Sequence, residues 1–176
     1  DYLIFTDHRF HHLPWIEARK PSDPVMFMGS QAHYLMRSTL RRPIRSALEL
    51  CSGSGFQSLY SSAFADRVVG VDYNKRAVNF ARLNAIVNNA WNVTFVEGDL
   101  FDAIRGERFD YIAATPPSSP SPGYELRFRD GGPSGADVLR RIITGIPDYL
   151  SSGGYAQVAT VVGEREGEPY LERIRR

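Results

Sequence analysis

The chain has 176 residues, of which 43% are hydrophobic, and a formal net charge of +1 at pH 7. This length suits one domain with a sizeable core but not two domains, and this charge favours neither a nucleic-acid-binding surface nor an acidic partner. The single cysteine, Cys51, excludes an internal disulfide, and no apolar run approaches the ~20 residues that span a bilayer. We therefore expect no membrane segment and a cytoplasmic location. The chain starts with Asp1 instead of methionine, so we expect it to be a fragment of a longer protein.

Residues 1–42 are expected to form an N-terminal segment and helical cap, followed by a core at residues 43–176. The first part mixes aromatics, histidines and prolines without steady periodicity. No cysteine or carboxylate stands at metal-ligand spacing from its three clustered histidines, so we expect no metal site there. These histidines are His8, His11 and His12.

Residues 25–40 become apolar and then helical in pattern, and Ser30 is the expected N-cap of this helix. The simple interpretation is a helix that covers one face of a sheet.

The stretch 46–59, SALELCSGSGFQSL, predicts a short buried strand, a turn and a helix over residues 56–64. Gly53 and Gly55 leave no side chain between the backbone and a ligand, and the N–H groups of the helix start face the same place. A glycine pair alone is weak support, because such pairs close many strand-to-helix turns.

Two carboxylates strengthen the prediction of a cofactor site. Glu49 lies in the strand just before the turn, where a carboxylate needs a hydroxyl or ammonium partner. A second strand, expected at residues 67–71, ends in Asp72, where an open α/β sheet places a carboxylate against a ribose diol. A dinucleotide-binding oxidoreductase would also have this acidic residue. However, Ser58 replaces its third glycine, and an acidic residue before the glycines suits an ammonium better than a pyrophosphate.

Further elements follow at regular intervals. A helix is expected at residues 75–88 and a strand at 93–97, followed by Asp99 and Leu100. Because Asp99 comes at the carboxyl end of a strand, we expect it in the ligand crevice, although it would also serve as an Asx turn or N-cap. A fourth strand is expected at 109–114.

The segments ELCSGSG and VVGVD resemble the first two motifs of the class I S-adenosylmethionine-dependent methyltransferases. The resemblance implies an α/β, Rossmann-like core: a mostly parallel sheet of order 3-2-1-4-5 with helices on both faces, and with the family's C-terminal strands missing. It implies S-adenosylmethionine as cofactor and S-adenosylhomocysteine as product, with Asp99 accepting from the adenine amino group and residues 27–30 folding over the methionine end. The cofactor-binding residues implied are Glu49, Cys51, Gly53, Gly55, Phe56, Asp72, Tyr73, Asp99 and Leu100.

The fourth strand is followed by Thr115, Pro116, Pro117 and Ser118. This run resembles the Asn-Pro-Pro-aromatic motif of enzymes that methylate planar nitrogens, including release-factor glutamine methyltransferases and rRNA guanine methyltransferases with a small methyltransferase domain. In that family the asparagine and a proline carbonyl orient the target nitrogen and the aromatic ring stacks on it. The resemblance implies that Thr115, Pro116 and Pro117 form the transfer point. A hydroxyl replaces the carboxamide and Ser118 offers no ring, so the acceptor is left open.

The resemblance continues through residues 124–137 and 146–159. Ser118 and Arg129 are expected to contact substrate, although a salt bridge of Arg129 that anchors the loop is an equally good interpretation. After a Gly-Gly turn, a fifth strand is expected at 157–162. It would be a long apolar edge, so we expect a dimer or a covering segment there, and the N-terminal segment is the expected cover.

The function implied is methyl transfer to a protein, RNA or small-molecule acceptor. Few catalytic side chains are needed, because the methyl group of the cofactor is already activated. The alternatives are a small-molecule O- or C-methyltransferase and a catalytically inactive scaffold domain that binds the cofactor.

Overall fold

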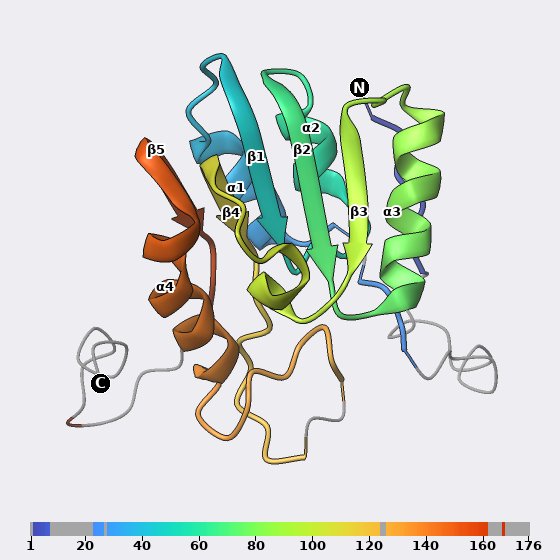
Figure 1. Cartoon of the computed structure of the whole chain (residues 1–176). Helices are drawn as coiled ribbons and strands as arrows, with labels where there is room; N and C mark the ends of the chain where they lie inside the picture. The colour runs from blue at the N-terminus through green and yellow to red at the C-terminus, as the bar shows by residue number, and fades with distance from the viewer. Residues whose placement is uncertain (1, 8–22, 27, 124–125, 162–166, 168–176) are drawn as a thin grey trace.

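The computed structural model describes residues 2–7, 23–26, 28–123, 126–161 and 167 (Figure 1). Five strands form one parallel sheet of order β3-β2-β1-β4-β5, which confirms the predicted topology. The two strands predicted at 93–97 and 109–114 have those bounds, and the first two strands begin earlier than predicted. The strands are β1 (Ile44–Leu50), β2 (Ala65–Asp72), β3 (Val93–Glu97), β4 (Phe109–Ala114) and β5 (Leu150–Val158).

One helix precedes β1 and the others occupy the crossovers, as a parallel sheet requires. They are α1 (Ser30–Ser38), α2 (Phe56–Ser61), α3 (Lys75–Val87), the 3-10 helix η3 (Leu100–Ile104) and α4 (Asp137–Tyr149). The prediction of Ser30 as N-cap is wrong by one residue: Gly29 is the N-cap, since its carbonyl accepts the first helical bond from the His33 N–H. In the described part of the chain, the helices are all too short or too polar to span a membrane.

The sheet is covered on both faces, which explains why its central strands are so apolar. Leu48, Leu50 and Ile112 point to the face that packs against η3 and α4, where Phe101 and Ile142 complete the cluster. Figure 1 shows η3 in front of the sheet and α1 and α2 behind it. The rear face carries a second cluster with Leu35 of α1, and a third joins α2, α3 and β3. The members of these two clusters are Leu35, Ala47, Ala65, Val68, Tyr111 and Ala113, and then Leu59, Val78, Ala81, Ala85, Ala90 and Phe95.

β5 begins earlier than predicted, so the prediction of a strand at 157–162 is wrong. The Gly153–Gly154 pair, expected to form the turn before this strand, lies inside it. The pairing of β4 with β5 shifts register between Phe109 and Tyr111, which marks a bulge, and Gly153 adopts the left-handed φ of 74° there. The glycines therefore serve a bulge within β5 and not a turn before it.

The strand register brings the carboxyl ends of four strands into one row. Leu50 pairs with Val71 of β2 and with Ala114 of β4, and Asp72 pairs with Glu97. The residues that follow these ends therefore emerge at the same edge of the sheet, where ligands bind in open α/β folds.

Residues 2–7 run along α3, on the β3 side of the sheet. The Asn88 side chain exchanges two hydrogen bonds with the backbone of Leu3, and the Asn84 side chain does the same with Phe5. For these residues, the expectation that the N-terminal segment covers the β5 edge is wrong. The linker after α1 does reach β5, since Tyr155 Oη donates to the Leu40 carbonyl, but through a side chain and not along the strand edge.

Candidate functional site

A cavity of about 920 Å³ lies at the carboxyl ends of the strands. All but one of the predicted site residues line it, although they come from segments far apart in the sequence. The exception is Gly55, where a Cβ would meet the Phe95 ring at 2.6 Å, so this glycine serves packing against β3. The predicted residues that line the cavity are Glu49, Cys51, Gly53, Phe56, Asp72, Tyr73, Asp99, Leu100, Thr115, Pro116, Pro117, Ser118 and Arg129.

Glu49 is 5% exposed and faces α2 from β1. Its Oε2 accepts from the Ser58 backbone N–H at 2.8 Å and from the Ser58 hydroxyl at 2.5 Å. The pKa of Glu49 is raised to about 8, chiefly by burial and to a smaller extent by the nearby Asp72. The Ser58 hydrogen bonds act in the opposite direction and lower it. The hydroxyl partner that the sequence required is thus Ser58. The carboxylate also borders the cavity, where it would meet an ammonium group.

Asp72 holds the glycine turn and the start of α3 together. Its Oδ2 accepts from the Gly53 N–H at 2.7 Å and its Oδ1 from the Asn74 N–H at 2.8 Å. Burial raises the pKa of Asp72, while the two backbone hydrogen bonds lower it. Each carboxylate oxygen can accept a second hydrogen bond, so Asp72 retains capacity for a pair of hydroxyls in the cavity.

Asp99 follows β3 and is the N-cap of η3, but its side chain makes no capping hydrogen bond. Its Oδ2 instead accepts from Arg141 Nη2 of α4 at 2.9 Å. Asp99 therefore holds the expected N-cap position through its backbone and not through its side chain, and the carboxylate is held at the cavity by a residue that the sequence analysis did not identify. In the sequence, Arg141 is marked only by its position three residues after Val138 on an amphipathic helix, which puts the two side chains on the same helix face. Both residues line the cavity.

Thr115 to Ser118 line the other end of the cavity, and a following loop supports them. The N–H groups of Ser118 and Ser119 donate to the Arg129 carbonyl at 3.0 and 2.9 Å. The Asp130 side chain, which is 0% exposed, accepts from the Leu126 N–H at 2.8 Å and from Arg129 Nε at 2.7 Å. The Arg129 hydrogen bond in particular lowers the pKa of Asp130. The predicted anchoring salt bridge of Arg129 is confirmed, and substrate contact by the same residue stays a prediction.

Residues 24–26 of the N-terminal segment also line the cavity. Asp7 accepts from the Val25 N–H at 2.7 Å and pairs with Arg76 of α3. Asp23 pairs with Arg127 of the loop at 3.6 Å, and the Arg127 guanidinium lies 5.1 Å from the centre of the Tyr73 ring. Segments from the two halves of the chain thus meet across the cavity.

The expected cover over the methionine end falls partly outside the described residues, because Phe27 is not described. Met28 and Gly29 line the cavity beside Gln31. Gln57 of α2, which the sequence analysis also missed, lines it and donates through Nε2 to the Thr39 hydroxyl at 3.2 Å. These contacts join the helical cap to the cavity wall.

Cysteine could act as a nucleophile and histidine as a metal ligand, but neither residue type adds such a group to the cavity described above. Burial raises the pKa of the Cys51 thiol, so it is a poor nucleophile despite its place in the cavity. The three clustered histidines of the N-terminal segment lie outside the described residues, and the residues that are described contain no group of three potential metal ligands.

Comparison with known proteins places this geometry in context. The methyltransferase small domain family matches residues 28–171. A protein of Methanocaldococcus jannaschii, named provisionally as a protein N5-glutamine methyltransferase, is 38% identical over 69% of this chain and 66% of its own length. The release factor glutamine methyltransferase of Geobacter sulfurreducens is 33% identical over 81% of this chain and 55% of its own length. The chain therefore spans between about half and two thirds of these relatives.

A solved structure shares the fold. The S-adenosylmethionine-dependent methyltransferase of Thiobacillus denitrificans, in complex with S-adenosylhomocysteine, superposes with a TM-score of 0.54 at 19% identity. The match covers 75% of this chain and 48% of that one.

Proposed function

Because the chain belongs to the methyltransferase small domain family, we propose that it transfers a methyl group from S-adenosylmethionine to an acceptor bound beside Thr115. The observation that carries the proposal is the cavity itself. Three carboxylates border it at the ends of successive strands, and the Thr-Pro-Pro-Ser segment borders it at the other end. The proposed core is residues 43–176 and the helical cap is residues 1–42.

The donor set of the cavity fits S-adenosylmethionine. Glu49 would accept from the ammonium of the methionine part, Asp72 from the ribose hydroxyls and Asp99 from the adenine amino group, with Gly53 leaving backbone against the ligand. Phe56, Leu100 and the carbon atoms around Cys51 supply apolar surface. The cofactor, when bound, supplies a sulfonium methyl group that a nucleophile can displace directly.

The chain's own task at the transfer point is to orient the acceptor. Thr115, Pro116 and Pro117 follow β4, whose buried residues fix where the segment starts, and the Arg129 carbonyl fixes Ser118. A positioned acceptor supplies most of the acceleration in a displacement of this kind. If the acceptor carries a proton, no buried base is needed beside it, since the proton can leave after methyl transfer.

The acceptor proposed is a protein side chain, because the relatives named above act on protein glutamine. A planar amide acceptor should bind less well beside Thr115 than beside the asparagine of the Asn-Pro-Pro-aromatic motif. The Thr115 hydroxyl rotates, donates as well as accepts, and reaches less far than a carboxamide. If glutamine is the acceptor, Thr115→Asn should raise the rate of methylation.

The test follows methyl transfer from labelled cofactor to a release-factor peptide, to rRNA and to a metabolite extract. The protein and Thr115→Asn are compared, with Thr144→Asn on the exposed face of α4 as the matched control. Labelling of the peptide that rises with Thr115→Asn alone supports the proposal in full. Efficient peptide labelling by the unchanged protein would show that Thr115 is no handicap. Labelling of metabolites only would favour a small-molecule O- or C-methyltransferase, and labelling of nothing would favour an inactive scaffold.

Two further points belong to the proposal. Since the relatives act on translation factors or ribosomal proteins, we place the protein in the cytoplasm. In the described part of the chain, β5 pairs with β4 on one side. A dimer or a covering segment would satisfy the backbone groups on its other side. Light scattering at increasing concentration checks for the dimer.

A further inference from the structure

Among the described residues, the ion pairs Arg129–Asp130 and Arg141–Asp99 border the cavity with both partners, and in the second pair neither side chain is buried. Arg141 Nη2 and Asp99 Oδ2 lie 2.9 Å apart, and the two side chains are 52% and 45% exposed. An ion pair so open to solvent contributes little to folding stability. A ligand seated in the cavity would exclude water from the pair and strengthen it.

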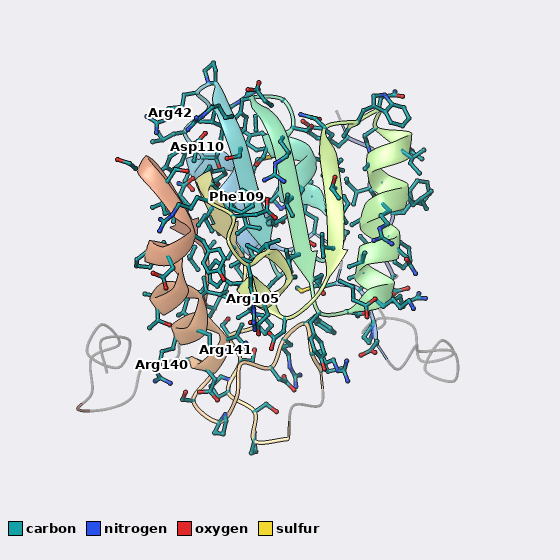
Figure 2. All side chains as sticks on the ribbon, viewed as in Figure 1. Arg42, Arg105, Phe109, Asp110, Arg140 and Arg141 are labelled. Carbon is teal, nitrogen blue, oxygen red and sulfur yellow. The ribbon has the colours of Figure 1, made fainter. Side chains whose placement is uncertain are left out.

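Apolar side chains that pack in one cluster line the cavity together with this pair, and we call this part of the lining the slot. Val138 precedes Arg141 by one helical turn on α4, and Val71 and Leu100 come from the strand end and from η3. Such a slot accepts a flat ring, and a polar atom on the edge of that ring would meet the Asp99 carboxylate. Figure 2 shows Arg141 near the start of α4, on the side of the strand ends.

We propose that Arg141 is a positioning residue that makes this slot selective for a purine with a 6-amino group. The inference rests on the proposed function, since it assigns the slot to the adenine of the cofactor. Arg141 donates to Asp99 Oδ2 and so limits rotation of the carboxylate, which leaves Oδ1 available to the base.

A charged, fixed carboxylate distinguishes two closely similar bases. A 6-amino group donates a hydrogen bond to Asp99, whereas a 6-oxo group presents an acceptor to an acceptor. Sites built around one hydrogen bond reject a ligand that cannot make it much more strongly than apolar pockets reject a change in size. Without Arg141, the Asp99 carboxylate can rotate toward solvent, and the selectivity should fall.

The experiment measures dissociation constants of S-adenosylhomocysteine and S-inosylhomocysteine by calorimetry. The unchanged protein should prefer the adenine compound by about tenfold or more, as expected for a hydrogen bond to a charged group. Arg141→Met should reduce this ratio to about threefold or less, chiefly by weakening the adenine compound. Arg141→Lys keeps a cation and should give an intermediate ratio.

The matched control is Arg105→Met. Arg105 pairs with Asp102 in the neighbouring η3 region at 2.6 Å, outside the cavity lining, and Figure 2 labels it. This variant should keep the parental ratio, and thermal unfolding confirms that each variant folds. If Arg141→Met does not fold, the lowered ratio must be seen in Arg141→Lys.

The outcomes separate this inference from the proposed function. An unchanged base preference in the folded Arg141 variants, with normal binding by the parent, would overturn the role of Arg141 and leave the methyltransferase proposal intact. Binding of neither compound by the parent would overturn the proposed function and this inference with it.

Discussion

The two ends of the cavity are built in different ways. At the proposed cofactor end, Glu49 lies in β1, Asp72 ends β2 and Asp99 follows β3, so the register of adjacent strands sets their spacing. At the proposed acceptor end, Thr115 leads into a loop that the buried carboxylate of Asp130 helps to hold. We therefore expect changes at the acceptor end to disturb the fold and the cofactor end less than changes at the strand ends would.

The largest expected effect comes from removing the anchor of the acceptor end. Asp130→Ala removes the buried acceptor of the hydrogen bonds from Arg129 Nε and the Leu126 N–H, so the free energy of unfolding should fall by about 2 kcal/mol or more. Methyl transfer should fall further than cofactor affinity, because the loop supports Ser118. Chemical denaturation and S-adenosylhomocysteine binding measure the two effects.

Asp102→Ala is the matched control for Asp130. Asp102 also pairs with an arginine, but both side chains are largely exposed, at 59% and 77%, so its removal should cost less than about 1 kcal/mol. Equal losses for the two variants would contradict the anchoring role of Asp130.

The next effect tests the cofactor end. Asp72→Ala should weaken S-adenosylhomocysteine binding by roughly tenfold or more, since a hydrogen bond to a charged group contributes about 1.5 to 3 kcal/mol. Its backbone contacts also hold the turn, so Asp72→Asn, which keeps an acceptor oxygen, separates the two roles. Calorimetry measures the dissociation constant of each variant. An unchanged affinity in Asp72→Ala would contradict the proposal that Asp72 binds the ribose hydroxyls.

A pH series sharpens the comparison through Glu49. Its pKa of about 8 lies above the ordinary 4.5, so the folded protein holds this proton more tightly than the unfolded chain does. Stability should therefore fall as the pH rises from about 4.5 to about 8, and Glu49→Gln should remove that fall. Thermal unfolding across this range provides the measurement.

Ligand binding should show the opposite trend with pH. An ammonium group on the ligand favours ionised Glu49, so affinity for S-adenosylhomocysteine should rise between pH 6 and 7.5, by at most about tenfold per pH unit. Glu49→Gln should give a flat profile. A flat profile in the parent would show that no ammonium meets Glu49.

The smallest effect concerns the link between the two ends. The Arg127 pair with Asp23 is largely exposed, with side chains 55% and 39% accessible, so Arg127→Gln should leave stability unchanged within about 0.5 kcal/mol. Dissociation of S-adenosylhomocysteine should be about two- to fivefold faster, because the pair joins the walls of the cavity. Stopped-flow displacement measures it, with Arg45→Gln, a pair remote from the cavity, as the control.

The sequence predicted the strands that lead to Asp72 and Asp99 well, because strand periodicity is a local, regular property. A buried run followed by Asp72 or Asp99 fixes both the strand and the place of the carboxylate. Sequence reasoning failed where a contact joins distant segments: the pairing of Asp99 with Arg141 and of Glu49 with the Ser58 hydroxyl depends on side-chain packing. It also failed at β5, because a glycine pair serves a bulge as readily as a turn.

The asparagine contacts on α3 have a consequence for how this protein can vary. The hydrogen bonds from the Asn84 and Asn88 side chains to Phe5 and Leu3 all involve main-chain atoms of the N-terminal segment, so they recognise an extended backbone without regard to its side chains. Positions 3 and 5 should therefore accept most residues with little change in unfolding temperature, whereas proline, which lacks the N–H that each asparagine needs, should be excluded. The two asparagines should be intolerant of substitution, so the strict sequence requirement lies in the helix and the freedom lies in the segment that it binds.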